Sequence, residues 1–170
     1  MLRMFGRLGR TGTVALVVVT AFAIVVALLW LTPRGQGPAP VAAENCDASL
    51  WSHVYQAKRL VSVVPCTAVE GRVASVEADA DGDIHIELAP DDRSTLNIFN
   101  KLHTHGHLVV EVICQATPSA GDAAKACAGF TPQVAIPKPG ERVRVTGAYV
   151  TDHDNGWNEI HPVTRIEALH

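Results

Sequence analysis

The sequence predicts a mainly β domain, a five-stranded barrel with one short helix, which follows a single membrane-spanning helix. Three observations lead to this prediction: one uninterrupted apolar run near the N-terminus, five later segments of alternating apolar and polar residues, and an alanine-rich stretch before the last two of these segments. Domains commonly run to about 100–150 residues. A chain of 170 residues therefore accommodates one domain and an appendage.

The apolar run, residues 13–31, contains neither a charge nor a proline. As a helix it would rise about 28 Å, close to the roughly 30 Å hydrocarbon core of a bilayer. Arg3, Arg7 and Arg10 precede it, and the positive-inside rule then places residues 1–12 in the cytoplasm. We therefore expect a single-pass signal anchor in the cell membrane, with the rest of the chain extracytoplasmic.

A linker rich in Pro, Gly and Ala follows at residues 32–45, and the exported domain spans residues 46–170. Val41-Ala42-Ala43 has the small residues of a signal-peptidase site, although it lies well beyond the apolar run. Cleavage after Ala43, which would release a secreted domain, is the alternative to a retained anchor.

All four cysteines, Cys46, Cys66, Cys114 and Cys127, follow the apolar run. An even number of cysteines in an oxidising compartment favours two disulfides. Cys114 and Cys127 flank a short loop, which favours the pair Cys114–Cys127 and leaves Cys46–Cys66. Zinc binding is the alternative, but no two cysteines have CxxC spacing.

The exported part is acidic. Without the three N-terminal arginines, the chain has 11 Lys and Arg against 17 Asp and Glu. Nucleic-acid binding relies on basic surface that neutralises phosphate. The charge balance therefore argues against a nucleic-acid partner.

The exported domain opens with apolar residues at helical spacing in residues 47–64. A helix through this whole span would hold Cys46 and Cys66 about 25 Å apart. Their pairing limits the helix to one or two turns within residues 47–57, followed by an extended return.

Alternation with period two predicts the strands that follow. The first pair forms a hairpin around the polar turn DADGD, and the last pair flanks Asn155-Gly156, which favours a tight hairpin of the primed type. A long connection at residues 89–106 allows one helical turn, and a short helix capped by Asp122 is expected at residues 121–127. The expected strands are residues 67–79, 83–88, 107–114, 141–152 and 158–169.

Five short strands with a helix between the third and fourth is the order of the oligonucleotide/oligosaccharide-binding (OB) barrel. Gly71 would lie midway along the first strand, where a barrel strand bends, and Pro162 suits an edge or a bulge. An immunoglobulin-like sandwich needs about seven strands, more than the sequence offers.

The domain also resembles a group of exported bacterial and archaeal proteins of uncharacterised activity. The resemblance runs from Cys46 to about Ile166 and implies an OB-like extracytoplasmic domain, without implying a substrate. The residues that carry it are Cys46, His53-Val54-Tyr55, Arg59-Leu60, Cys66, Gly71-Arg72-Val73, Asp81-Gly82-Asp83-Ile84-His85-Ile86, Glu111, Cys114, Cys127, Val145-Thr146-Gly147-Ala148-Tyr149-Val150 and Trp157-Asn158-Glu159-Ile160-His161-Pro162-Val163.

The segment HTHGH supplies the first candidate metal ligands, His103, His105 and His107. Alternate residues of a strand point to one face, so these imidazoles could converge on a divalent ion. The alternative is a polar loop around Gly106 with solvated histidines.

The last hairpin supplies a second group of candidates. Glu159 and His161 would share a strand face beside Trp157, and His85 on another strand could join them, which gives a set of metal or acid–base groups. Asp152 and His153, with Trp157, are candidates for a binding surface. The alternative is that Trp157 and His161 cap the barrel, with Glu159 or the backbone satisfying the imidazole.

The alternating carboxylates Asp79, Asp81 and Asp83 are typical of a calcium loop, but a bidentate Glu at its end is missing, and a polar hairpin turn explains them equally well. No GxSxG motif is present to support nucleophilic catalysis.

The sequence therefore predicts a membrane-tethered, extracytoplasmic OB-like binding or accessory module without catalytic activity. Its expected partners are the membrane, through the N-terminal helix, and an envelope protein or a small ligand. The alternative is a metal-binding protein or metal-dependent hydrolase that uses His85, Glu159 and His161, with a divalent metal as cofactor.

Overall fold

The computed structural model of the chain describes residues 45–170. The expected anchor at residues 13–31, and the linker up to residue 44, lie outside the described residues. Within the described part, no helix has the length and apolar character needed to cross a membrane.

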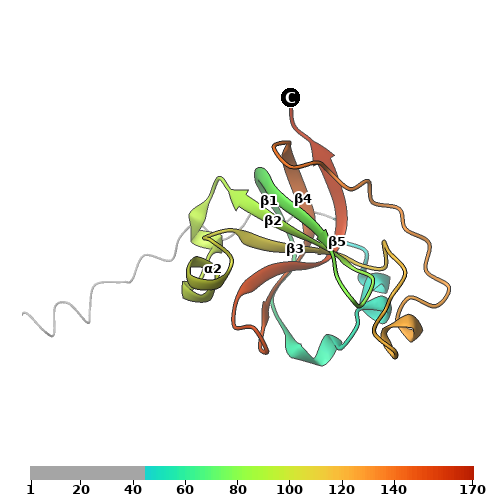
Figure 1. Cartoon of the computed structure of the whole chain (residues 1–170). Coiled ribbons are helices and arrows are strands. Elements are labelled where there is room, and N and C mark those ends of the chain that lie inside the picture. Colours follow the sequence, from blue (N-terminus) through green and yellow to red (C-terminus); the bar gives the residue numbers. More distant parts are fainter. Residues whose placement is uncertain (1–44) are drawn as a thin grey trace, which may run out of the picture. The chain divides into compact units, whose positions relative to one another are not determined.

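The described residues form a five-stranded mixed sheet that closes into a ring (Figure 1). The strands are β1 (Leu60–Ala78), β2 (Ile84–Pro90), β3 (Leu108–Val112), β4 (Arg142–Asp152) and β5 (Asn158–Ala168). Their order around the ring is β1-β2-β3-β5-β4, with β4 returning to β1. The β3–β5 pair is parallel and the other pairs are antiparallel. The prediction of a mainly β domain with five strands is confirmed.

The first strand is longer than predicted because its N-terminal part, the expected extended return, also pairs with β4. Leu60 lies opposite Asp152, and the pairing continues, with register shifts, to Arg72. Gly71 pairs with both β4 and β2, so it lies where β1 passes from one partner to the other. A Cβ at this position would overlap the backbone carbonyl oxygen of Ala89, which is why glycine suits the bend.

Both predicted disulfides are present, Cys46–Cys66 and Cys114–Cys127. The first accompanies a short helical segment, as expected: two 3₁₀ helices, η1 (Ala48–His53) and η2 (Ala57–Arg59), precede β1. Two disulfides indicate an oxidising, extracytoplasmic location.

The connections contain little helix. Between β2 and β3 lie η3 (Arg93–Thr95) and α2 (Ile98–His103), and the side chain of Asn97 caps α2. Between β3 and β4 the predicted helix is a single 3₁₀ turn, η4 (Ala123–Lys125). Asp122 occupies the N-cap position of η4, as predicted, but its side chain makes no capping hydrogen bond and instead accepts one from the Tyr55 hydroxyl at 2.7 Å.

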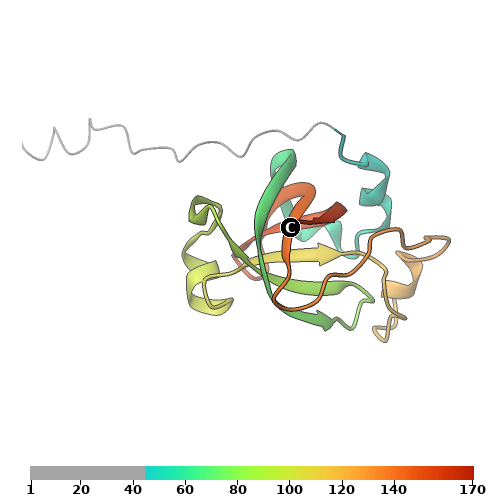
Figure 2. The same cartoon turned by 90° about the horizontal axis from the view of Figure 1, so that it is seen from above.

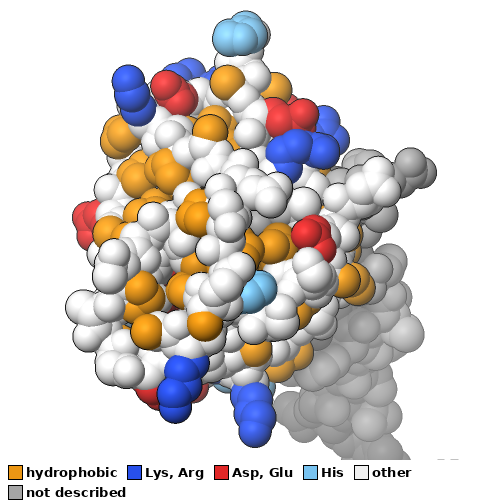
Figure 3. All heavy atoms as spheres, turned by 90° about the vertical axis from the view of Figure 1, so that its right-hand side faces the viewer, with side chains coloured by type: hydrophobic (Ala, Val, Ile, Leu, Met, Phe, Trp, Pro, Cys, Tyr) orange, Lys and Arg blue, Asp and Glu red, His pale blue; other side chains and the backbone are white. Residues whose placement is uncertain are grey.

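Two apolar clusters fill the domain. The larger lies within the ring and includes Val73, Leu88 and Ile160. The smaller packs η1 against β4 and the residues that follow β3. Figures 1 and 2 place α2 on the opposite side of the sheet from η1 and η4. The face that carries η1 and η4 exposes mainly apolar and neutral side chains at its centre, with charged side chains toward its edges (Figure 3).

Candidate functional site

A hollow of about 510 Å³ lies between the β1–β2 turn and the β4–β5 turn, and we name it the acidic pocket. Seven acidic residues line it against two basic ones, Arg59 and His85. Three neutral polar residues and one Trp complete the lining. The full set is Tyr55, Gln56, Arg59, Glu77, Asp79, Asp81, His85, Glu111, Asp152, Asp154, Asn155, Trp157 and Glu159.

The β1–β2 turn forms one wall of the acidic pocket. The N–H of Asp79 donates to the Asp83 carbonyl oxygen at 2.9 Å, and Gly82 adopts a positive φ of 95° that a turn requires. The Asp81 carboxylate accepts from the backbone N–H of Asp83 at 3.1 Å, while the Asp83 carboxylate accepts from the N–H of Cys114 at 2.8 Å. The aspartates thus serve different partners, which favours the polar hairpin turn over a calcium loop.

The β4–β5 turn forms the opposite wall, and it corrects the two-residue hairpin that the sequence suggested. The N–H of Asp152 donates to the Trp157 carbonyl oxygen at 3.0 Å, so the loop comprises residues 153–156. Both primed turn types need a positive φ at the first central residue, which would be Asn155, but Asn155 has none and only Gly156 does. The Asp152 carboxylate instead accepts from the N–H groups of Asp154 and Asn155, at 2.7 and 3.3 Å.

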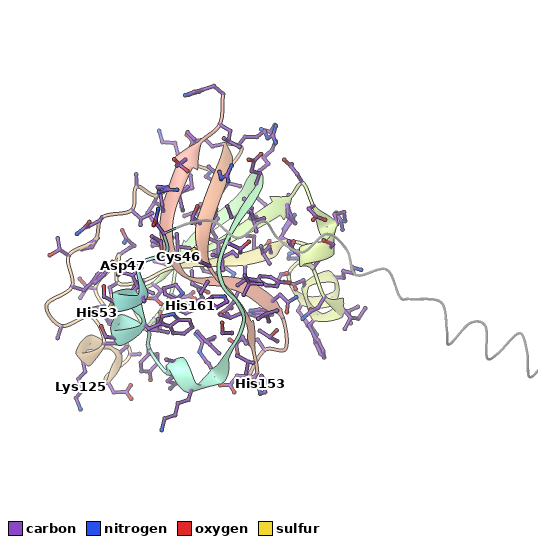
Figure 4. All side chains as sticks on the ribbon, turned by 180° about the vertical axis from the view of Figure 1, so that it is seen from behind. Cys46, Asp47, His53, Lys125, His153 and His161 are labelled. Carbon is purple, nitrogen blue, oxygen red and sulfur yellow. A yellow bond between two sulfur atoms is a disulfide. The ribbon has the colours of Figure 1, made fainter. Side chains whose placement is uncertain are left out.

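Asp152 and His153, expected at a binding surface, have different surroundings. Asp152 is completely buried and forms an ion pair with Arg59 in addition to its turn hydrogen bonds. Its carboxylate therefore holds the turn. His153 is exposed at the edge of the molecule and is absent from the lining of the acidic pocket (Figure 4).

His85 and Glu111 form a cross-strand pair in the acidic pocket. They are register partners on β2 and β3, and the His85 Nδ1 lies 2.8 Å from the Glu111 Oε1. Burial opposes protonation of His85, but the hydrogen bond and the charge of Glu111 outweigh it and raise the pKa of His85 to about 9. His85 is therefore protonated at neutral pH, while burial also raises the pKa of its partner Glu111.

The closed sheet brings His85 to the last hairpin. The His85 ring lies edge-on to the Trp157 indole, with 6.5 Å between centroids. Glu159 and His161 share a face of β5, and Trp157 directly precedes this strand. The Trp157 Nε1–H donates to the Glu159 Oε2 at 3.0 Å, and the His161 Nδ1 lies 3.0 Å from the Glu159 Oε1. Glu159 thus bridges the indole and the imidazole.

His161 lies in the interior of the domain (Figure 4). Its Nε2 is 3.8 Å from the Asp83 Oδ2. Burial opposes protonation of this imidazole, but the hydrogen bond and charge of Glu159 raise its pKa. Burial raises the pKa of Asp83 to about 7, against the lowering effect of the Cys114 N–H.

Three buried polar atoms of this region have no hydrogen-bond partner within residues 45–170. They are the Asp83 Oδ2, the Glu111 Oε2 and the His161 Nε2. Glu111 is the one of these residues that lines the acidic pocket. Buried polar atoms are normally hydrogen-bonded. The oxygen of Glu111 is thus a polar atom suited to a ligand in the pocket.

The structure does not bring all the predicted ligands together in one place. In the acidic pocket, donor atoms of Asp79, His85 and Glu111 all lie within 4.8 Å of one another. In that grouping His85 joins Asp79 and Glu111 instead of the expected Glu159 and His161.

The HTHGH histidines also divide. His103 ends α2 and stacks on Phe99, with ring centroids 6.0 Å apart. His105 and His107 instead approach Glu87, with which their donor atoms form a second group within 4.8 Å.

Glu111 is the member of the Asp79–His85–Glu111 group that was not a candidate ligand in the sequence. It is the one charged residue of LVVEV, the wholly buried strand β3. A carboxylate in such a strand needs a partner. That requirement is the signal by which Glu111 could have been found.

Comparison of the sequence with models of protein families and with curated proteins finds no match. The resemblance to exported bacterial and archaeal proteins therefore stays a prediction.

Proposed function

We propose that the chain is a membrane-tethered, extracytoplasmic OB-like module that binds a small cationic ligand in the acidic pocket and catalyses no reaction. Support for the OB-like assignment comes from five strands closed into a ring, with a helical turn between β3 and β4. OB barrels bind ligands beside their β1–β2 and β4–β5 loops. The acidic pocket occupies the equivalent place.

The observation that carries the proposal is the charge of the lining. Seven carboxyl groups face two basic side chains, and both bases already have acidic partners, Arg59 with Asp152 and His85 with Glu111. Carboxylates at Glu77, Asp81 and Asp154 have no ion-pair partner among the described residues. A pocket of one sign concentrates ligands of the opposite charge.

The size and the wall of the pocket suit a small organic cation. A volume of about 510 Å³ falls within the range of about 300–1,000 Å³ for small-molecule sites. Trp157 lies in the wall, and its indole N–H is held by Glu159. An aromatic face beside carboxylates attracts ammonium groups by cation–π interaction as well as by charge. Glu111 contributes a buried oxygen without a protein partner.

A divalent metal ion is the second candidate ligand, because Asp79, His85 and Glu111 offer three donor atoms in one place. The hydrolase that the sequence suggested has less support. A catalytic metal keeps a position open to water, whereas His161 is buried and its Nδ1 is bound to Glu159.

The test is a titration of the full-length chain, purified without a tag in detergent, with spermidine, a flexible trication. The variant Asp79→Asn/Asp81→Asn removes two carboxylates of the acidic pocket. The control Asp91→Asn/Glu167→Gln removes two exposed carboxylates that bond to arginines at the other end of the strands. We expect the first variant to bind about fivefold more weakly and the control to bind like the wild type.

Equal binding by both variants would contradict the acidic pocket as the site, and absence of saturable spermidine binding would contradict the small organic cation. Zinc added in place of spermidine tests the second candidate, with His85→Ala as the variant. A tight zinc-binding step that His85→Ala removes, without spermidine binding, would favour the metal.

A further inference from the structure

We infer that Glu87, His105 and His107 form a second site, separate from the acidic pocket, for a divalent transition-metal ion. The site lies where the outer face of β2 meets the loop between α2 and β3. None of the three residues lines the acidic pocket. The inference therefore does not depend on the proposed ligand of that pocket.

The geometry carries the inference. The two oxygens of one carboxylate approach two imidazoles: the Glu87 Oε1 lies 3.4 Å from the His105 Nδ1, and the Glu87 Oε2 lies 2.8 Å from the His107 Nδ1. Donor atoms of all three residues lie within 4.8 Å of one another. Two ligands of a tetrahedral zinc ion, each about 2.0–2.1 Å from the metal, are about 3.4 Å apart. The His105–Glu87 distance already matches this spacing, and His107 would exchange its hydrogen bond to Glu87 for a bond to the ion.

The backbone holds the two histidines in place before any ion binds. The carbonyl oxygen of His107 accepts hydrogen bonds from the Asn100 side chain at 3.1 Å and from the buried Thr104 hydroxyl at 2.6 Å. The N–H of Gly106 donates to the Asn100 carbonyl oxygen at 2.9 Å. His105 lies between these anchors. A preorganised loop lowers the entropic cost of binding.

The conformation of His105 is unusual for its residue type. Its φ of 56° lies in the left-handed region, where glycine is favoured, and the next residue is a glycine with φ of 76°. The left-handed backbone turns the His105 side chain back toward Glu87, whereas the preceding histidine, His103, lies on α2 and stacks on Phe99.

The donor set selects the class of ion. Two imidazole nitrogens and one carboxylate suit Zn²⁺, Cu²⁺ or Ni²⁺, whereas Mg²⁺ and Ca²⁺ prefer oxygen ligands only. The His105 side chain is 79% exposed, so water completes the coordination of the bound ion. Such a site exchanges its ion with the surroundings and does not serve as a closed structural centre.

The experiment is a calorimetric zinc titration of the full-length, untagged chain. His105→Ala is the main variant, because this exposed side chain can be removed without opening the core. His103→Ala is the matched control within the same HTHGH segment, and His85→Ala removes the imidazole of the acidic pocket. His107→Ala and Glu87→Gln complete the set, with circular dichroism to verify that each variant is folded.

We expect one zinc-binding step that His85→Ala and His103→Ala retain and that His105→Ala weakens at least about tenfold. A tenfold excess of Mg²⁺ should leave this step unchanged. The inference is overturned if no such step occurs, if His105→Ala binds like the wild type, or if His103→Ala weakens binding equally. Spermidine binding by His105→Ala should remain intact. Failure of this inference and failure of the proposed function therefore give different results.

Discussion

Replacement of Asp83 by asparagine tests the electrostatics beneath the acidic pocket. Asp83 is buried, and its Oδ2 faces His161 without a hydrogen-bond partner in the described part of the chain. Asp81 and Glu111 are the other acidic groups that raise its pKa, in addition to burial. An asparagine keeps an oxygen for the N–H of Cys114 and cannot ionise.

The magnitude follows from the pKa of Asp83, which rises from an ordinary 3.8 to about 7. Each pKa unit corresponds to about 1.4 kcal/mol, so ionising this buried carboxylate costs at most about 4 kcal/mol of folding free energy. The folded state keeps its proton up to about pH 7, whereas the unfolded chain releases it near pH 4. This carboxylate therefore lowers the stability of the wild type as pH rises through this window.

The assay is urea unfolding of the wild type and Asp83→Asn at pH 5 and pH 8, followed by tryptophan fluorescence. We expect the free energy of unfolding of Asp83→Asn, relative to the wild type, to increase by about 2–3 kcal/mol from pH 5 to pH 8, because about two of the three pKa units lie between these pH values. A variant whose difference from the wild type is the same at both pH values would refute the reasoning, since the carboxylate would then ionise without penalty.

Three further predictions concern the His85–Glu111 pair, the Cys114–Cys127 disulfide and Gly147. Glu111→Gln should lower the pKa of His85 from about 9 toward its ordinary 6.5, because it removes the charge that stabilises the imidazolium, as measured by NMR titration of the ring. Replacing Cys114 and Cys127 by serine should lower the free energy of unfolding by about 3 kcal/mol, since the disulfide joins residues 13 apart, as measured by urea unfolding. Gly147→Ala should lower the free energy of unfolding by more than about 2 kcal/mol in the same assay, because the new Cβ would lie 2.5 Å from a backbone oxygen of β5.

Each of these predictions has a contrasting outcome. An unchanged His85 pKa in Glu111→Gln would mean that another carboxylate, such as Asp79 at 3.8 Å, dominates the imidazole. A serine double variant that is as stable as the wild type would mean that the β3–β4 loop is held by its other contacts. Gly121→Ala is the control for Gly147→Ala, since a Cβ at Gly121 meets nothing within 4 Å.

Local patterns in the sequence were sufficient for most of the sheet. Residues 83–88 alternate because β2 buries Ile86 and Leu88 while His85 and Glu87 face outward, and this alternation predicts a strand directly. Pro162 was expected at an edge or a bulge, and β5 shifts register against β4 around it. Gly71 was expected at a bend, and it lies where β1 pairs with both β2 and β4.

Features that depend on long-range partners were beyond local patterns. The β4–β5 turn contains Asn155-Gly156, but the carboxylate of Asp152 and its ion pair with Arg59, 93 residues away, select a longer loop. Asp122 precedes a helical turn, yet it bonds to Tyr55, 67 residues away. In each case a tertiary contact outweighs a local preference.

The predictions of the candidate sites were likewise correct where they depended on one regular element and wrong where they did not. Period-two spacing predicted that Glu159 and His161 share a strand face beside Trp157, and Glu159 bonds to both of the other side chains. The same spacing suggested one face for all three HTHGH histidines, but His103 belongs to a helix and His107 precedes a strand. Spacing along the chain identifies neighbours only within one regular element.

The most direct test of the central claim, that the acidic pocket is the ligand site, is NMR mapping of spermidine on the isotopically labelled full-length chain. We predict that the largest saturable shift changes occur at Asp79, His85 and Trp157, and that they diminish as salt is added. Shift changes concentrated instead around η1 and Phe130, which line a separate hollow, would contradict the claim and would assign ligand binding to that hollow.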